Sequence, residues 1–573
     1  MKFTETFPRL LLIAVVAVII YSNSFNASWH LDDYPSIIEN YKIKTLSEGF
    51  KNIIFNSRSV CDLSFKLNYY FGETDVFGFH IVNIAIHILS AFMVYFLIKL
   101  TLERLGNNGY KNLPLAGALL FVAHPIQTQA VTYIVQRYTS LATMFYLMAL
   151  VLFIKARMNL LQRNITFFSK YHFPFYLSSL LCALLAMRTK EIAVTIPIIF
   201  LLYDFIFLKK RNRGLRDTLI YLLPYFILLL IILVLRVFFV SPDFAGIGES
   251  IDRSFKDTAR ISRIEYAFTS INVVLTYIRL LLLPINQNIY YIYPISSSVF
   301  SNHTYLSILF HIGIIISAIL IFKKSRLISF GIFWFYITIL VESSIIPIRD
   351  VIFEHRLYLP SVGIVLSIVG LMRLKFEWKR ELYTLFSIII FIFCIACYNR
   401  NIVWQNEFTL WTDCLRKSPD SSLARNNLGL AYYKQGNLEK AIKEFNSALK
   451  LNLKKQDKAL IYNNLYIIYI SQAKIDEAMR MVLMALKTDP FSAEAHNNIA
   501  NIYSHQGKLE NAINEYEIAL KIKPNMAAEI HYNIGIAYKK SGFMKKAKEE
   551  FMYALKTNPN FLPAYQEIES ISR

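Results

Sequence analysis

The sequence is short of cysteine and of acidic residues, and each shortage removes a class of function. Its 573 residues include only 5 cysteines, which are scattered, with Cys394 and Cys397 inside an apolar run. Such placement is typical of small buried side chains, so we expect neither a redox site nor a zinc site. The 40 acidic residues stand against 61 lysines and arginines. These basic residues fall in short clusters between apolar runs, as in the cytoplasmic loops of membrane proteins, so we expect no nucleic-acid partner.

Long apolar runs are what the chain has in excess. Hydrophobic residues make up 55% of it, and a helix needs about 20 mostly apolar residues to cross a bilayer. Because no small-residue cleavage site follows the first run, we expect that run to stay in the protein as a span. We expect about eleven spans, near residues 8–26, 77–100, 113–124, 138–154, 173–188, 192–208, 218–240, 304–322, 328–347, 356–373 and 381–398.

The distribution of lysine and arginine predicts the orientation of these spans. Lys2 and Arg9 precede the first span and place the N-terminus inside. If the apolar run 264–283 also crossed, two basic loops would lie outside, so we expect it to be an interfacial or re-entrant helix. The composition, rich in Lys, Asn and Ile, favours a bacterial inner membrane with its outer face in the periplasm over the endoplasmic reticulum and its lumen. The predicted outer segments are 27–58, 188–191, 241–303, 348–355 and the polar C-terminal tail.

A repeat of 34–37 residues begins near residue 422, where the composition turns polar. Small residues at fixed positions let two helices approach closely, and aromatic residues fill the space between units. The pattern predicts about four tetratricopeptide (TPR) units, which stack into a concave groove for peptides, so we expect a protein partner. Units one and four carry it most fully, in Leu428-Gly429, Tyr432, Gly436, Ala441, Phe445 and Ala448, and in Ile534-Gly535, Tyr538, Gly542, Ala547, Phe551 and Ala554.

The register of the repeat continues backward from residue 422. Trp411 and Cys414 occupy, one period earlier, the positions of Phe445 and Ala448, which indicates a half repeat. No Gly/Ser/Pro-rich spacer follows the last span, so we expect a rigid fusion instead of a flexible linker. The fold class predicted is all-α, a polytopic membrane helix bundle followed by a TPR α-solenoid. Its divisions are a membrane domain over 1–398, a half-repeat junction over 399–421 and repeats over 422–573.

Two adjacent carboxylates, Asp32 and Asp33, follow the first span on the predicted outer face. They are either ordinary solvated loop acids or a general base that deprotonates an acceptor hydroxyl. A glycosidase needs a second carboxyl group to protonate a poor leaving group. A sugar carried on phosphate has a good leaving group, so one base and cationic phosphate ligands suffice.

Basic residues on the predicted outer face could supply those ligands. Arg188 and Lys190, followed by the acid Glu191, lie between two spans, and Arg349, His355 and Arg356 precede another. They are either residues that reach for lipid headgroups or a clamp for a polyprenyl phosphate. Arg137 begins an apolar run and would face the same cavity.

Polar residues also lie within a predicted span. His80, Asn83 and His87 share one helical face. They either line an aqueous cavity or bond neighbouring helices as packing residues. Neither histidine has a carboxylate or cysteine nearby in sequence, so we assign no metal site.

Taken together, these segments resemble the transmembrane and tetratricopeptide-repeat protein O-mannosyltransferases, which belong to the GT-C fold superfamily. The resemblance covers nearly the whole chain and implies a catalytic aspartate at Asp32 or Asp33. It also implies that Lys190 and His355-Arg356 contact the lipid phosphate, and it adds His124 and Gln127 to the cavity candidates His80 and Asn83. The matching motifs are Leu31-Asp32-Asp33-Tyr34, Gly78-Phe79-His80-Ile81-Val82-Asn83, His124-Pro125-Ile126-Gln127-Thr128, Val135-Gln136-Arg137, Thr189-Lys190-Glu191 and Glu354-His355-Arg356-Leu357-Tyr358-Leu359-Pro360.

Two positions depart from the family pattern. Gln129 stands where relatives often have Glu, and Tyr138-Thr139 stand where an Asp follows the arginine. Any contribution of those acids to substrate or metal is missing here, so the donor sugar could differ from mannose.

The function predicted is inverting transfer of mannose or a similar hexose from a polyprenyl-phosphate carrier to Ser/Thr hydroxyls of exported proteins. The carrier lipid and an acceptor or partner protein on the repeats are the expected partners, and the requirement for a divalent metal is left open. The alternatives are a transferase that modifies a lipid or glycan, and a non-catalytic membrane scaffold.

Overall fold

The computed structural model describes residues 3–40, 43–44, 58–106, 111–163, 167–208, 215–240, 261–344, 346–348, 350–375 and 380–572. Every regular element within these ranges is a helix, which confirms the all-α prediction. The chain divides into two compact units, residues 1–410 and 411–573. The division falls inside α16 (Glu407–Lys417), in the segment predicted as a half repeat, and that interpretation of the segment stays a prediction.

The first unit has the composition of a multi-pass membrane protein. Eight of its described helical segments are long and apolar enough to cross a membrane, and four shorter apolar helices accompany them. Its α-helices are α1 (Phe3–Tyr21), α2 (Ser59–Gly72), α3 (Val76–Arg104), α4 (Leu113–Ala123), α5 (Thr128–Thr132), α6 (Arg137–Arg163), α7 (Phe173–Met187), α8 (Ile196–Tyr203), α9 (Leu215–Val240), α11 (Arg263–Leu282), α12 (Thr304–Ile321), α13 (Arg326–Ile339), α14 (Ser361–Lys375) and α15 (Arg380–Val403).

Each of the predicted apolar runs overlaps one of these helices. Helix α11 occupies the run 264–283, and its length and hydropathy would also allow it to span a bilayer. Its capping box, in which Ser262 and Glu265 bond each other's backbone N–H, defines where it begins. Its interfacial placement therefore stays a prediction.

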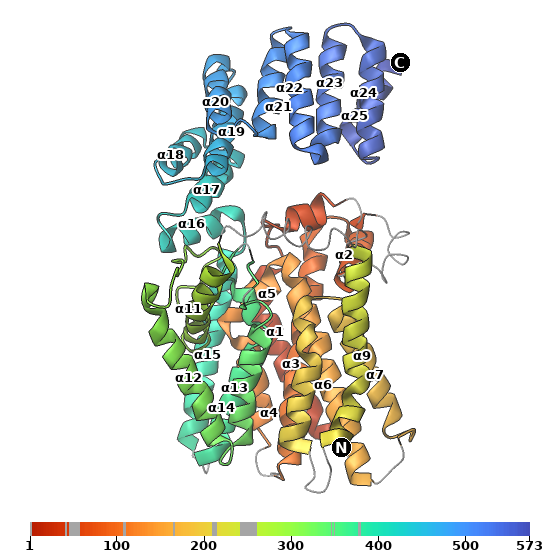
Figure 1. Cartoon of the computed structure of the whole chain (residues 1–573), viewed down its shortest axis with the longest axis vertical. Helices are drawn as coiled ribbons and strands as arrows, with labels where there is room; N and C mark the ends of the chain where they lie inside the picture. The colour runs from red at the N-terminus through yellow and green to blue at the C-terminus, as the bar shows by residue number, and fades with distance from the viewer. Residues whose placement is uncertain are drawn as a thin grey trace. The chain divides into compact units, whose positions relative to one another are not determined.

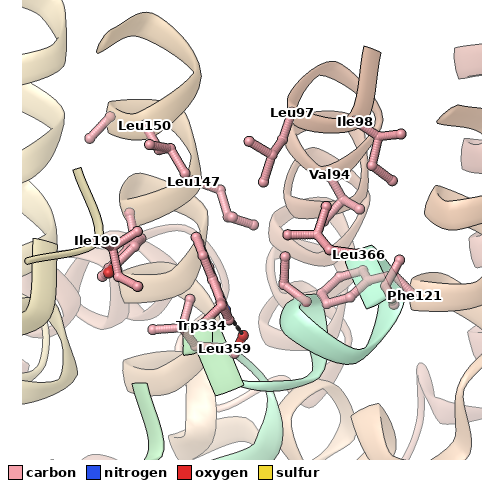
Figure 2. Close-up of a cluster of buried hydrophobic side chains, with 14 of the residues drawn as sticks. Val94, Leu97, Ile98, Phe121, Leu147, Leu150, Ile199, Trp334, Leu359 and Leu366 are labelled. Carbon is pink, nitrogen blue, oxygen red and sulfur yellow. Dashed lines mark hydrogen bonds between the residues drawn. The ribbon is translucent and has the colours of Figure 1, made fainter. Parts of the chain in front are cut away.

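Small residues let the helices of the first unit approach closely. A Cβ atom on Gly331 of α13 would lie 2.3 Å from the carbonyl oxygen of Gly363 in α14, so only glycine fits this crossing. Next to it, the Trp334 indole donates a hydrogen bond to the Leu359 carbonyl at 3.0 Å. Figure 2 shows this bond among buried side chains from α3, α4 and α6, including Phe121. The close crossing fixes the position of α14 and of the segment that precedes it.

The loops that carry the predicted site lie at one end of the first unit. Helix α2 and the short α5 are at the end opposite the N-terminus (Figure 1). The same end receives the chain leaving α1, whose buried Asp33 bonds the backbone of Val135 beyond α5. Segments distant in sequence therefore meet where chemistry was predicted.

The second unit is a stack of helix pairs that matches the predicted repeat. In units one and four a glycine faces an aromatic ring, since a Cβ on Gly429 or Gly535 would lie 2.7 Å or 2.5 Å from Phe445 or Phe551. The pairs are α17 (Ser422–Lys434) with α18 (Leu438–Leu449), α19 (Lys455–Ser471) with α20 (Ile475–Thr488), α21 (Ala493–His505) with α22 (Leu509–Ile522) and α23 (Ala527–Lys540) with α24 (Met544–Thr557), followed by α25 (Leu562–Ser572).

Candidate functional site

The two adjacent aspartates after α1 have opposite environments. Asp33 is completely buried, and its carboxylate oxygens accept the backbone N–H groups of His30 at 2.9 Å and of Val135 at 2.7 Å. Burial raises the pKa of Asp33 to about 8, and the neighbouring charge of Asp32 adds to that rise. The side chain of Asp32 is exposed. Only Asp32 therefore presents a carboxylate outside the packed core.

The loop around Asp32 is held from two sides. Its backbone N–H donates to the Tyr133 hydroxyl at 2.8 Å, and the Tyr133 ring stacks on Trp404 with centroids 5.5 Å apart. The His30 imidazole bonds the Trp404 carbonyl at 2.7 Å. Leu31 has a positive φ of 38°, a conformation that strains a non-glycine residue. Strain of this kind persists where the surroundings over-determine the backbone, which these contacts do.

Arg137 is buried and serves the packing of the same region. Its Nε donates to Asn83 and its Nη1 to Asn68, each at 2.6 Å, and its Nη2 donates to the Phe79 carbonyl at 2.9 Å. The guanidinium also lies over the Phe65 ring, 4.5 Å from its centroid. The predicted contact of Arg137 with a lipid phosphate stays a prediction. The arrangement gives Arg137 a positioning role that ties α2, α3 and α6 together.

The predicted cavity residues are also buried within packed helices. His80 bonds the carbonyl of Ala27 at 3.0 Å, and His124 bonds that of Leu281 at 2.9 Å. Gln127 has no exposed surface, and neither has Asn83. For His80 and Asn83 the geometry favours the packing alternative, and the predicted cavity role of His124 and Gln127 stays a prediction.

A cation and a carboxylate form the centre of a second group. The Nζ atom of Lys190 lies 2.7 Å from a carboxylate oxygen of Glu342, and donates to the Thr139 hydroxyl at 2.9 Å. The two side chains are only 9% and 13% exposed. A buried ammonium needs such partners to stay charged. Glu342 was not among the predicted site residues, although an acid within the predicted span 328–347 was a signal for it.

His355 lies in the same group as a neutral ring. Burial lowers its pKa well below the ordinary value, and the charges of Lys190 and Arg356 lower it further. Its backbone N–H donates to the Gln129 side-chain oxygen at 2.7 Å, and its ring stacks on Phe353. Within the described residues, the ring Nδ1 has no hydrogen-bond partner. That atom is a buried polar position without a partner among the described residues.

Arg356 organises the backbone around this group. It donates to the carbonyl oxygens of Val351 at 3.0 Å, Asp350 at 2.7 Å and Glu342 at 3.5 Å. The guanidinium therefore shapes the turn on which His355 sits. The structure brings Lys190, His355 and Arg356 together, as expected.

The remaining predicted site residues lie apart or cannot be placed. Glu191 pairs with Arg58 at 3.4 Å, and both side chains are partly exposed. Arg349 lies outside the described residues. No group of three or more His, Cys, Asp or Glu that could hold a metal occurs in the described parts of the chain, and the need for a metal stays untested.

Comparison with known proteins identifies both parts of the chain. Tetratricopeptide-repeat models match residues 422–454, 482–514 and 528–561, and a TPR-repeat model matches 500–542. Protein O-mannosyl-transferase F38B6.6 of Caenorhabditis elegans is 25% identical over 78% of this chain and 63% of that protein. Protein O-mannosyl-transferase TMTC3 is 23% identical in Mus musculus and 22% identical in Homo sapiens, over 77% of this chain and 51% of each relative.

The chain is a relative of these O-mannosyl-transferases. The predicted family resemblance is confirmed. The chain spans between 51% and 63% of the length of these curated relatives.

The structure also shows what surrounds the two positions that depart from the family pattern. Gln129 supplies the oxygen that accepts the His355 N–H. The Tyr138 hydroxyl donates to Asp62, and Thr139 accepts from Lys190. A carboxylate from another element, Asp62 of α2, therefore lies beside Tyr138.

Proposed function

We propose that this protein is a membrane glycosyltransferase that moves a hexose from a polyprenyl-phosphate donor to Ser/Thr hydroxyls of proteins. The similarity to O-mannosyl-transferases over 77–78% of the chain supports the class of reaction. The donor, the acceptor and the orientation in the membrane are inferences from the site and from the distribution of charge.

Asp32 is the general base of the proposed reaction. The observation that carries this assignment is the contrast between the exposed Asp32 and the buried Asp33. A base must reach the proton that it removes, and the Asp33 oxygens are already engaged by two backbone N–H groups. Asp33 instead holds the loop that presents Asp32. The deprotonated hydroxyl attacks the anomeric carbon from the face opposite the phosphate, which inverts its configuration.

Lys190 and His355 face the departing lipid phosphate. Negative charge grows on the phosphate as the bond to the sugar breaks, and a fixed cation stabilises that charge best where water is excluded. The nearly buried Lys190 supplies the charge, and the unpartnered Nδ1 of His355 supplies a further polar contact. Arg356 positions the turn between them. The TPR unit then binds the acceptor protein on the same, extracytoplasmic side.

Glycan mass spectrometry on exported proteins tests this proposal. Cells would carry the wild type, Asp32→Asn or Asp33→Asn, with the amount of each variant in the membrane measured. We expect Asp32→Asn to remove a Ser/Thr-linked hexose, and Asp33→Asn, which keeps one of the two acceptor oxygens, to retain part of that sugar. Protein glycans that are unchanged while lipid glycans change would replace the proposal with the lipid-modifying alternative. Glycans unchanged in both classes would leave a non-catalytic scaffold.

A further inference from the structure

Glu342 touches both cations of the proposed phosphate site. Its carboxylate lies 2.7 Å from the Lys190 ammonium, and its backbone carbonyl accepts from Arg356 at 3.5 Å. The Tyr266 hydroxyl donates to the same carbonyl at 3.2 Å, which fixes the backbone of Glu342. The proposed phosphate site therefore contains a negatively charged side chain, although its proposed ligand is also negatively charged.

We propose that Glu342 promotes release of the lipid phosphate after transfer, because it disfavours the doubly charged product more than the singly charged donor. The inference rests on the proposed function. It assigns to Glu342 a role in distinguishing product from donor, whereas Lys190 and His355 contact the phosphate of both.

The charge on the phosphate changes during the reaction. The donor is a phosphodiester with one negative charge. Transfer breaks the bond between the anomeric carbon and the phosphate oxygen, which keeps the electron pair, while the hydroxyl proton goes to Asp32. The product is a phosphomonoester, which carries a charge of about −1.5 to −2 at pH 7. The lipid phosphate therefore gains nearly one negative charge while it lies against Lys190.

A carboxylate beside the ammonium acts on that additional charge. A phosphate that contacts Lys190 lies within a few ångströms of Glu342, because the carboxylate and the ammonium are 2.7 Å apart. Repulsion scales with the product of the charges, so it is nearly doubled for the monoester. Both side chains are largely shielded from water, which keeps this repulsion from being screened. Binding of the product is therefore weakened relative to binding of the donor.

The competing explanation is that Glu342 only orients a buried lysine. Its loss would then weaken the binding of singly and doubly charged lipids alike. The two explanations therefore differ in the sign of one measurement, the affinity of the Glu342→Gln variant for the monoester.

The experiment compares two lipids that differ by one ionisable oxygen, undecaprenyl phosphate and undecaprenyl methyl phosphate. Binding to the purified full-length protein would be measured by native mass spectrometry at pH 8 and at about pH 5, below the second pKa of the monoester. We expect the wild type to bind both lipids with affinities within about threefold, and Glu342→Gln to prefer the monoester by at least about tenfold at pH 8. At the lower pH, where both lipids carry one charge, that preference disappears.

Glu191→Gln is the matched control, since it removes the adjacent carboxylate that pairs with Arg58 instead of Lys190. It should leave the ratio of the two affinities unchanged. If Glu342→Gln fails to fold, the wild type alone decides, because a preference of more than tenfold for the monoester at pH 8 overturns the proposal. Equal or weaker monoester binding by Glu342→Gln also overturns it. A wild type that binds neither lipid refutes the polyprenyl-phosphate donor itself, which is a different result.

Discussion

Asp33 accepts a hydrogen bond from the backbone N–H of Val135 at 2.7 Å, a contact between residues 102 positions apart in the chain. The bond joins the loop after α1 to the segment that leads into α6. Its second carboxylate oxygen holds the N–H of His30. The loop is therefore closed by a buried carboxylate, while Asp32 next to it stays accessible. Because the two aspartates have different environments, substitutions can test their roles separately.

Replacing each aspartate with alanine should produce different defects. Asp32→Ala removes an exposed side chain, so we expect an unchanged unfolding temperature and a loss of transfer of at least about a hundredfold. Asp33→Ala leaves two buried N–H groups without acceptors, which costs about 1–3 kcal/mol for each. Thermal unfolding and a transfer assay on the same purified samples check both. A transfer defect without any loss of stability in Asp33→Ala would contradict its positioning role.

The raised pKa of Asp33 predicts how stability depends on pH. Because its pKa is about 8 in the folded protein and about 3.9 in an unfolded chain, the folded state binds the proton more tightly. Its contribution to stability is complete below about pH 4 and is lost as the pH rises through about 8. Asp33→Asn cannot titrate. The unfolding temperature of the wild type should therefore fall relative to Asp33→Asn across this window, and parallel curves would refute the shift.

Arg137 should affect the fold more than lipid binding. Arg137→Met leaves Asn83 and Asn68 without their donor, so we expect a loss of about 1–3 kcal/mol for each. Arg137→Lys keeps the charge but cannot reproduce the geometry of several bonds, so it should rescue only part of the stability. Undecaprenyl phosphate affinity, measured on the folded fraction, should stay within about threefold of the wild type. A large loss of affinity at full stability would restore Arg137 as a phosphate ligand.

Ala473 occupies a turn position that other repeats give to glycine. It has a positive φ of 55°, as Gly436, Gly507 and Gly542 have at 76°, 72° and 83°. A left-handed conformation costs an L-residue about 1–2 kcal/mol. Glycine avoids this cost, but its greater conformational entropy in the unfolded chain offsets part of the gain. We expect Ala473→Gly to stabilise the repeat unit by about 0.5–1 kcal/mol. Gly507→Ala is the matched reverse change, and its unfolding transition should move the other way.

His496 stands in the third repeat where the first repeat has an arginine. Its Nδ1 lies 2.6 Å from a carboxylate oxygen of Glu515, and its Nε2 lies 3.1 Å from the carbonyl of Pro490. Both partners only accept hydrogen bonds. Arg425 makes the corresponding two bonds in the first repeat, to Glu444 and to the carbonyl of Pro419.

This geometry predicts that an arginine can replace His496. His496→Arg should keep both bonds, because Arg425 makes the corresponding two bonds in the first repeat. We expect the unfolding temperature of this variant to equal or exceed that of the wild type. A lower unfolding temperature would show that the two positions are not equivalent.

Local patterns were sufficient for the parts of this protein that repeat or extend along one axis. Apolar runs long enough for a bilayer predicted the helices of the first unit, because burial of apolar surface acts on every turn of a helix. The repeat could be recognised because Gly429 and Phe445 recur at the equivalent positions of unit four, as Gly535 and Phe551. Each glycine packs against the phenylalanine of its own unit.

The candidate site depended on contacts that no local pattern encodes. Asp32 and Asp33 are neighbours of one residue type, and only the N–H groups of His30 and Val135 make one buried and leave the other exposed. The sequence predicted Arg137 to be a phosphate ligand. The residues that surround it belong to α2 and α3, so the sequence next to Arg137 gives no sign of them. The partner of Lys190 is Glu342, which lies 152 residues further along the chain. Composition along a chain determines which segments are buried, but packing between helices decides which buried charge meets which partner and therefore which side chains remain free for chemistry.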